Sequence, residues 1–130
     1  MQDRERAQLI ITAAQDLKAE EILLYDLQTR STVTDFIVIC SGRSQAHVKG
    51  ISNKIEARLK ECGFAPRGIE GYSEGSWVLL DFDVVIVHIF HPETRLYYDL
   101  EGLLQSFPHE PFPPPVPKPP ASSDEGTARS

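Results

Sequence analysis

The sequence predicts an α/β (α+β) fold: a single domain in which helices flank a mixed β-sheet. The chain has 130 residues, of which 41% are hydrophobic, so it has the length of one domain and enough apolar residues for a core. An apolar strand at 35–40 is followed by a turn and an amphipathic helix, which is typical of a crossover between parallel strands. Two further apolar runs, 77–80 and 84–90, are separated by a tight turn and indicate an antiparallel hairpin.

The N-terminal part of the chain predicts a helix and two strands. Apolar residues at helical spacing, with charged residues on the other face, indicate a helix close to the N-terminus: Leu9, Ile10, Ala13, Ala14 and Leu17. The apolar run 22–27 predicts a short strand. After a polar stretch, residues 35–40 are β-branched and aromatic, which is typical of a buried strand.

The next segment predicts a helix with defined ends. Ser44 is a suitable N-cap because its hydroxyl can accept a hydrogen bond from the first helical turn. Gly63 is suited to the C′ position, where the backbone often adopts a positive φ. The apolar stripe between them consists of Val48, Ile51, Ile55 and Leu59.

The second half predicts mainly strands. Residues 67–70 form a short strand candidate, and the hairpin follows with its turn at Asp81–Asp83. Pro92 ends the second hairpin strand, and residues 93–104 are expected to form one or two helical turns.

The composition changes at Phe107, so we divide the chain into a domain at 1–106 and a tail at 107–130. Eight of the ten prolines lie between Pro108 and Pro120. Such a segment buries too little apolar surface to offset its ordering entropy, and we expect it to be disordered. An alternative is that 113–117 forms a polyproline II helix that docks in an aromatic groove.

Charge and cysteine content restrict the classes of partner and compartment. The formal net charge of −6 disfavours sequence-independent nucleic-acid binding and favours a basic partner. Cys40 and Cys62 lack metal-ligand or CxxC spacing, so we expect two reduced thiols in or near the core of a cytoplasmic protein. No segment has the ~18 apolar residues of a membrane span, and the N-terminus resembles neither a signal nor a transit peptide.

Catalytic motifs are weak in this sequence. The pair Asp81 and Asp83 suggests a Mg²⁺ site that would act with a phosphate bound near Ser41 and Gly42, as in a nucleotidyltransferase. Tight turns often contain such aspartates for structural reasons, so a structural or partner-binding role is favoured over metal binding. We therefore predict no enzyme, no catalytic residue, no metal site and no cofactor.

Strand alternation predicts a binding surface on the hairpin instead. Trp77, Leu79 and Asp81 fall on one face of the first strand, and His88 and Phe90 on one face of the second. His91 points the other way, so the two histidines make a poor metal pair. Aromatic residues surrounded by acids suit an interface with a basic partner. The predicted partner-binding residues are Trp77, Leu79, Asp81, His88, Phe90, Tyr98 and Glu101.

Five segments in order resemble one family, the ribosomal silencing factors (RsfS, or Iojap proteins). Residues 35–44, DFIVICSGRS, resemble that family's D-[YF]-h-V-I-x-[ST]-G-x-S. The other four are His47-Val48-Lys49 with Ile51, Glu70-Gly71 with Trp77–Asp81 (W-V-L-L-D), Val85–Phe90 (V-V-V-H-I-F) and Arg95–Leu103 (R-x-[FY]-Y-x-L-E-x-L). The resemblance covers about residues 5–104.

The resemblance implies a fold similar to nucleotidyltransferases without their catalytic carboxylates. It also implies a translational repressor that binds the large ribosomal subunit through ribosomal protein fourteen, a basic protein. Binding there would sterically block association with the small subunit and lower translation under nutrient limitation. A possible homodimer of the free protein is expected because an exposed aromatic patch must be covered. The net charge and the lack of an apolar span make neither DNA nor membrane an expected partner. The alternatives are a Mg²⁺-dependent nucleotidyltransferase that uses Asp81 and Asp83, or a homodimeric adaptor.

Two positions depart from the family pattern. The family usually has Gly-Asp or Asn-Asp where this chain has Asp83-Val84, and Leu-Trp where it has Leu104-Gln105. We therefore expect Asp83 to be a weaker contact than Asp81 and the edge of the interface to lack one aromatic anchor.

Overall fold

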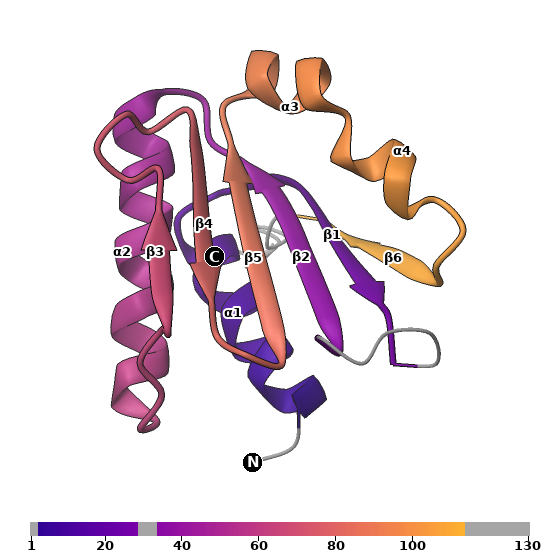
Figure 1. Ribbon diagram of the computed structural model, residues 1–130. Helices are drawn as coiled ribbons and strands as arrows, with labels where there is room; N and C mark the ends of the chain where they lie inside the picture. Colours follow the sequence, from indigo (N-terminus) through magenta and orange to yellow (C-terminus); the bar gives the residue numbers. More distant parts are fainter. Residues whose placement is uncertain (1–2, 29–33, 114–130) are drawn as a thin grey trace, which may run out of the picture.

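The computed structural model describes residues 3–28 and 34–113, which form one six-stranded mixed sheet with four helices (Figure 1). The sheet order is β3-β4-β5-β2-β1-β6, in which β2 and β5 are parallel and the other neighbours are antiparallel. In chain order the elements are α1 (Asp3–Asp16), β1 (Glu20–Asp26), β2 (Phe36–Ser41), α2 (Gln45–Glu61), β3 (Gly68–Glu70), β4 (Trp77–Asp81), β5 (Val85–Phe90), α3 (Pro92–Tyr98), α4 (Leu100–Leu104) and β6 (His109–Phe112).

Helices α1 and α2 cover one face of the sheet and enclose the larger core (Figure 1). Every second residue of the central strands points into this core, including Val38 of β2, Leu80 of β4 and Val87 of β5. A smaller cluster lies on the opposite face, where Leu104 of α4 packs near Tyr25 and Ile39. The predicted α/β class and mixed sheet are confirmed.

The predicted ends of α2 are confirmed. The Ser44 hydroxyl accepts a hydrogen bond from the His47 backbone N–H at 3.0 Å, as an N-cap does. Cys62 is the C-cap, and the following Gly63 has φ of +88°. Cys40 is buried as expected, but Cys62 is exposed, so its predicted place in or near the core is wrong.

The parallel pair is formed by β2 and β5, from Phe36 opposite Val85 to Ser41 opposite Phe90. The chain leaves β2 through α2 and enters β3, which is exposed along its length and lies at the edge of the sheet. The hairpin β4–β5 then returns to the centre of the sheet, where β5, apolar except for His88, is buried or half-buried throughout.

The strand β6 lies inside the segment whose composition predicts disorder, so that prediction is wrong for residues 109–112. It pairs antiparallel with β1, with Tyr25 opposite His109 and Ile22 opposite Phe112. Without β6, the backbone groups of β1 would form an unpaired edge. Pro111 is tolerated because an edge strand needs no donor on its outer side. Residues 114–130, with most of the proposed polyproline segment, lie outside the described residues.

Among the described residues, none of the helices combines the length and apolar character that crossing a bilayer requires.

Candidate partner-binding surface

The face of the sheet opposite α1 and α2 carries the hairpin residues that strand alternation predicts to form a binding surface. We call it the open face and define it by Trp77, Leu79 and Asp81 of β4, Ile86 and His88 of β5, and Ile37 and Ile39 of β2. Directly opposed residues in neighbouring strands point to the same face. The register opposes Leu79 to His88 and His88 to Ile39, so these side chains form one row across three strands.

An aromatic cluster lies at one end of the open face. The Trp77 ring lies 4.9 Å from the Phe90 ring and 4.8 Å from the Tyr98 ring, measured between centroids. Tyr98 is 53% exposed and Trp77 is half-buried, whereas Phe90 is fully buried beneath them. Trp77 and Tyr98 can therefore reach a partner. Phe90 was predicted as a partner-binding residue, but it is buried and packs against Trp77 from below.

His88 is a neutral polar group at the centre of the open face. Its Nδ1 accepts a hydrogen bond from the Trp77 indole N–H at 3.0 Å, which leaves the ring proton on Nε2. The side chain is 8% exposed, and burial lowers the pKa of His88 to about 4. His88 therefore orients the indole and contributes no charge near neutral pH.

The two aspartates of the hairpin turn are paired within the chain. Arg67 lies 3.5 Å from an Asp81 carboxylate oxygen and 3.0 Å from one of Asp83. The Asp81 carboxylate also accepts a hydrogen bond from the Asp83 N–H at 2.8 Å, which stabilises the turn. Among the described residues, no group of three or more His, Cys, Asp or Glu side chains could hold a metal ion. This arrangement favours the structural interpretation of the Asp81–Asp83 pair.

Glu101 of α4 forms an ion pair with Arg95 of α3, and this pair links the C-terminal helices to the sheet. The Arg95 guanidinium donates to both Glu101 carboxylate oxygens, at 2.9 Å and 3.1 Å, and to the Ser41 hydroxyl at 2.8 Å. Arg95 is buried, so this bidentate pair joins α3, α4 and the end of β2 in a partly dehydrated site. Glu101 therefore holds Tyr98 beside Trp77 and has little free charge for a partner.

Large apolar side chains project from α3 and α4 at the rim of the open face. Leu96, Tyr97 and Leu103 are 84%, 81% and 77% exposed. The sequence interpretation did not select Leu96 or Leu103, because in a short helix the apolar spacing alone cannot distinguish a buried from an exposed face. Exposed apolar groups of this size are typical of interaction surfaces.

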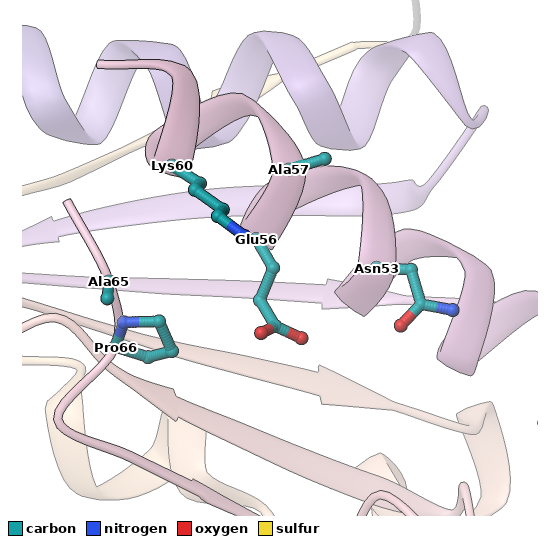
Figure 2. Close-up of a pocket in the computed structure, with 6 residues that line it drawn as sticks. All are labelled: Asn53, Glu56, Ala57, Lys60, Ala65 and Pro66. Atoms are coloured by element: carbon teal, nitrogen blue, oxygen red, sulfur yellow. The ribbon is translucent and has the colours of Figure 1, made fainter. Parts of the chain in front are cut away.

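A hollow lies beside α2, away from the open face. A cavity of about 430 Å³ is lined by Asn53, Glu56, Ala57 and Lys60 of α2 and by Ala65 and Pro66 of the segment that follows it (Figure 2). It combines one acid, one amine and one amide, and none of these six residues belongs to the open face. We therefore place the candidate site on the open face.

The comparisons with known proteins show which family the chain belongs to. The family model described as "Ribosomal silencing factor during starvation" matches residues 1–130. The chain belongs to this family. It is 37% identical to the ribosomal silencing factor RsfS of Bacillus subtilis (strain 168) over 103 residues, which are 79% of this chain and 87% of the relative. It is also 37% identical over 103 residues to the RsfS of Halalkalibacterium halodurans, covering 79% and 88% of the two chains.

A crystal structure of a Chromobacterium violaceum protein has the same fold as this silencing-factor chain. The two superpose with a TM-score of 0.79 at 34% identity, covering 81% of this chain and 88% of the other. The silencing-factor family is thus established, and with it a role in translation regulation.

The backbone explains one departure from the silencing-factor pattern. Asp83 stands where the family usually has Gly or Asn, and its φ is +72°. Glycine and asparagine adopt this left-handed conformation most readily, and aspartate is also enriched there. Asp83 therefore keeps the turn geometry, and Arg67 pairs the added charge.

Stability is expected to fall in mild acid because of His88. The unfolded ring binds a proton below about pH 6.5, whereas the folded ring remains neutral until its pKa of about 4. Between these values the unfolded state holds more protons, so lowering the pH from about 7 to about 5.5 should cost about 1 kcal/mol of unfolding free energy. Urea unfolding across this range measures it. His88→Asn retains an acceptor for Trp77, and its unfolding free energy should depend less steeply on pH than that of the wild type. Equal dependence on pH in the two proteins would contradict the role given to His88.

Replacing Glu101 by glutamine should loosen the C-terminal helices. Glu101→Gln leaves the buried Arg95 with a neutral partner and should lower the free energy of unfolding by about 1–2 kcal/mol. The matched control is Glu93→Gln, an exposed position in the first turn of α3. Chemical denaturation of both variants tests this. An unfolding midpoint of Glu101→Gln equal to that of the wild type would show that the Arg95–Glu101 pair does not hold the C-terminal helices.

Proposed function

We propose that this protein is a translational repressor that binds the large ribosomal subunit through ribosomal protein fourteen. The open face makes the contact and sterically blocks association with the small subunit. The protein would act in the cytoplasm and lower translation under nutrient limitation.

The observation that carries this proposal is the partly exposed aromatic cluster of Trp77 and Tyr98 on the open face. Binding hot spots are enriched in tryptophan and tyrosine, especially where neighbouring side chains exclude water. Leu79 and Ile86 are half-buried beside the cluster and supply apolar surface. Because the chain belongs to the silencing-factor family, the ribosome is the expected partner of this surface.

Charge supports a basic protein as the direct contact. The chain carries a formal net charge of −6, so ribosomal RNA would repel it at long range whereas a basic ribosomal protein would attract it. The carboxylates of Asp81 and Glu101 contribute less to this attraction than unpaired acids do, because Arg67 and Arg95 already lie beside them.

Steric exclusion requires no chemical step. The only acids that sequence reasoning proposed for catalysis, Asp81 and Asp83, are engaged by Arg67 in the turn. We therefore assign no catalytic residue, cofactor or substrate to this protein.

A subunit-joining assay tests the function. Purified large subunits are incubated with saturating protein, small subunits are added, and joined ribosomes are measured by sucrose-gradient sedimentation. We expect the protein to travel with large subunits and joined ribosomes to decrease. Normal joining at saturation would reject the repressor mechanism, and binding to small subunits alone would reject the partner.

In the free protein, the open face is expected to mediate a homodimer, because an exposed aromatic surface gains stability when it is covered. Sedimentation velocity should detect a concentration-dependent dimer in the wild type and mainly monomer in Tyr98→Ala. Large subunits should dissociate this dimer, since both associations use the same face. A dimer that persists on the ribosome would contradict competition for this surface.

A further inference from the structure

A small pocket opens on the open face beside the aromatic cluster. It has a volume of about 260 Å³ and is lined by Glu70, Gly71, Trp77 and Leu79. These residues come from the end of β3, the connection after it, and β4. Its walls therefore combine an aromatic ring, an aliphatic side chain and one carboxylate.

The register places the Glu70 carboxylate on the open face. Glu70 is opposite Leu79 in the antiparallel pair β3–β4, so both side chains point to the same side of the sheet and extend the row that contains His88. Glu70 is exposed, and within residues 3–28 and 34–113 its side chain makes no ion pair or hydrogen bond. Asp81 and Glu101 are both paired with arginines, whereas Glu70 has no cation beside it in the described part of its own chain and is available to pair with a partner.

Gly71 shapes the wall of the pocket. Its φ is +81°, and a Cβ atom at this position would lie 2.0 Å from the Trp77 carbonyl oxygen. The chain after β3 can therefore pass directly against the start of β4 only because residue 71 has no side chain. This close approach keeps Glu70 and Trp77 on either side of one hollow.

We propose that this pocket is a subsite for a lysine or arginine side chain of the protein partner. The methylene groups of that side chain pack on Trp77 and Leu79, and its cationic group pairs with the Glu70 carboxylate. A nucleic-acid phosphate would be repelled by the same carboxylate, so the subsite selects a basic protein. This inference rests on the proposed function for the identity of the partner, but the chemistry of the pocket can be tested without the ribosome.

Trp77 is the only tryptophan of the chain, so its fluorescence reports occupancy of the pocket directly. The full-length protein is titrated with N-acetyl-arginine amide and N-acetyl-lysine amide, and with the neutral isostere N-acetyl-citrulline amide. Probes of this size are expected to bind in the millimolar range. We expect a saturable change with the cationic probes, no saturation with citrulline amide, and loss of the response in Glu70→Gln. Glu74→Gln, in the same connection but outside the pocket lining, is the matched control and should respond as the wild type does.

Binding to purified large subunits provides the second readout. Glu70→Gln should weaken the affinity about tenfold, as expected for a hydrogen-bonded charge, and should reduce its salt dependence. Glu74→Gln should have a much smaller effect.

The outcomes separate the subsite from the proposed function. A cation-specific fluorescence response without ribosome binding would reject the ribosomal partner and retain the subsite. An equal response to citrulline amide, an unchanged response in Glu70→Gln, or no saturable response to either cation would overturn the subsite, even if the protein binds large subunits normally.

Discussion

Replacing both Trp77 and Tyr98 by alanine is expected to weaken binding to the large ribosomal subunit by at least about a hundredfold. The two rings touch at a centroid distance of 4.8 Å and form the part of the aromatic cluster that reaches the surface. Because they contact each other, their single substitutions should not be additive, and either one alone should remove a large share of the affinity. Fluorescence cannot follow the double variant, so co-sedimentation with purified large subunits is the appropriate measurement.

The matched control for this experiment is Tyr72→Ala. Tyr72 is partly exposed, like Tyr98, but it accepts a hydrogen bond from Asn53 and lies near Lys49 on α2. Its removal should leave binding nearly unchanged. Circular dichroism of each variant establishes that it is folded. A folded Trp77→Ala, Tyr98→Ala variant that still sediments with large subunits would reject the open face as the contact surface.

The second large effect is expected from Gly71→Ala. The added Cβ would meet the Trp77 carbonyl oxygen at 2.0 Å, and the backbone there has a positive φ that alanine rarely adopts. Relieving this clash must shift β3 or the start of β4, so we expect a loss of about 3 kcal/mol in the free energy of unfolding. Urea unfolding followed by circular dichroism measures the loss.

Gly68→Ala is the control for Gly71→Ala because Gly68 lies nearby, at the start of β3. A Cβ at Gly68 would have no neighbour within 4 Å, and its φ is not in the left-handed region. The same substitution should therefore change stability little there. Equal midpoints for the two variants would show that the close approach at Gly71 is not required.

The central elements could be predicted from the sequence because their signals are local. Alternation in β4 and β5 places Trp77 and Leu79 on the face that carries His88, and the register confirms this. The cap of α2 at Ser44 was predictable for the same reason, since it depends on residues within one helical turn. The edge strand β6 was not, because its proline-rich composition disfavours a strand and only the unpaired edge of β1 makes it favourable.

The roles of the acidic residues also depend on tertiary contacts that the sequence does not reveal. Asp81 and Glu101 were predicted as contacts for a basic partner, but Arg67 and Arg95 pair with them in the folded chain. Glu70 was overlooked as a contact, although the Glu70-Gly71 pair was part of the resemblance to the family. An acid's availability depends on which cations the fold brings near it, and spacing along the chain does not reveal this.

By itself, the sequence determined the class of the fold, the faces of its strands and the family. These properties follow from periodicity, caps and ordered motifs, which neighbouring residues specify. Only the tertiary structure decided that β6 completes the sheet, that Phe90 lies beneath Trp77, and that Asp81 is paired with Arg67 whereas Glu70 is left unpaired among the described residues of the open face. Each of these depends on strand register and on contacts between distant segments, since burial and charge pairing are properties of the packed chain.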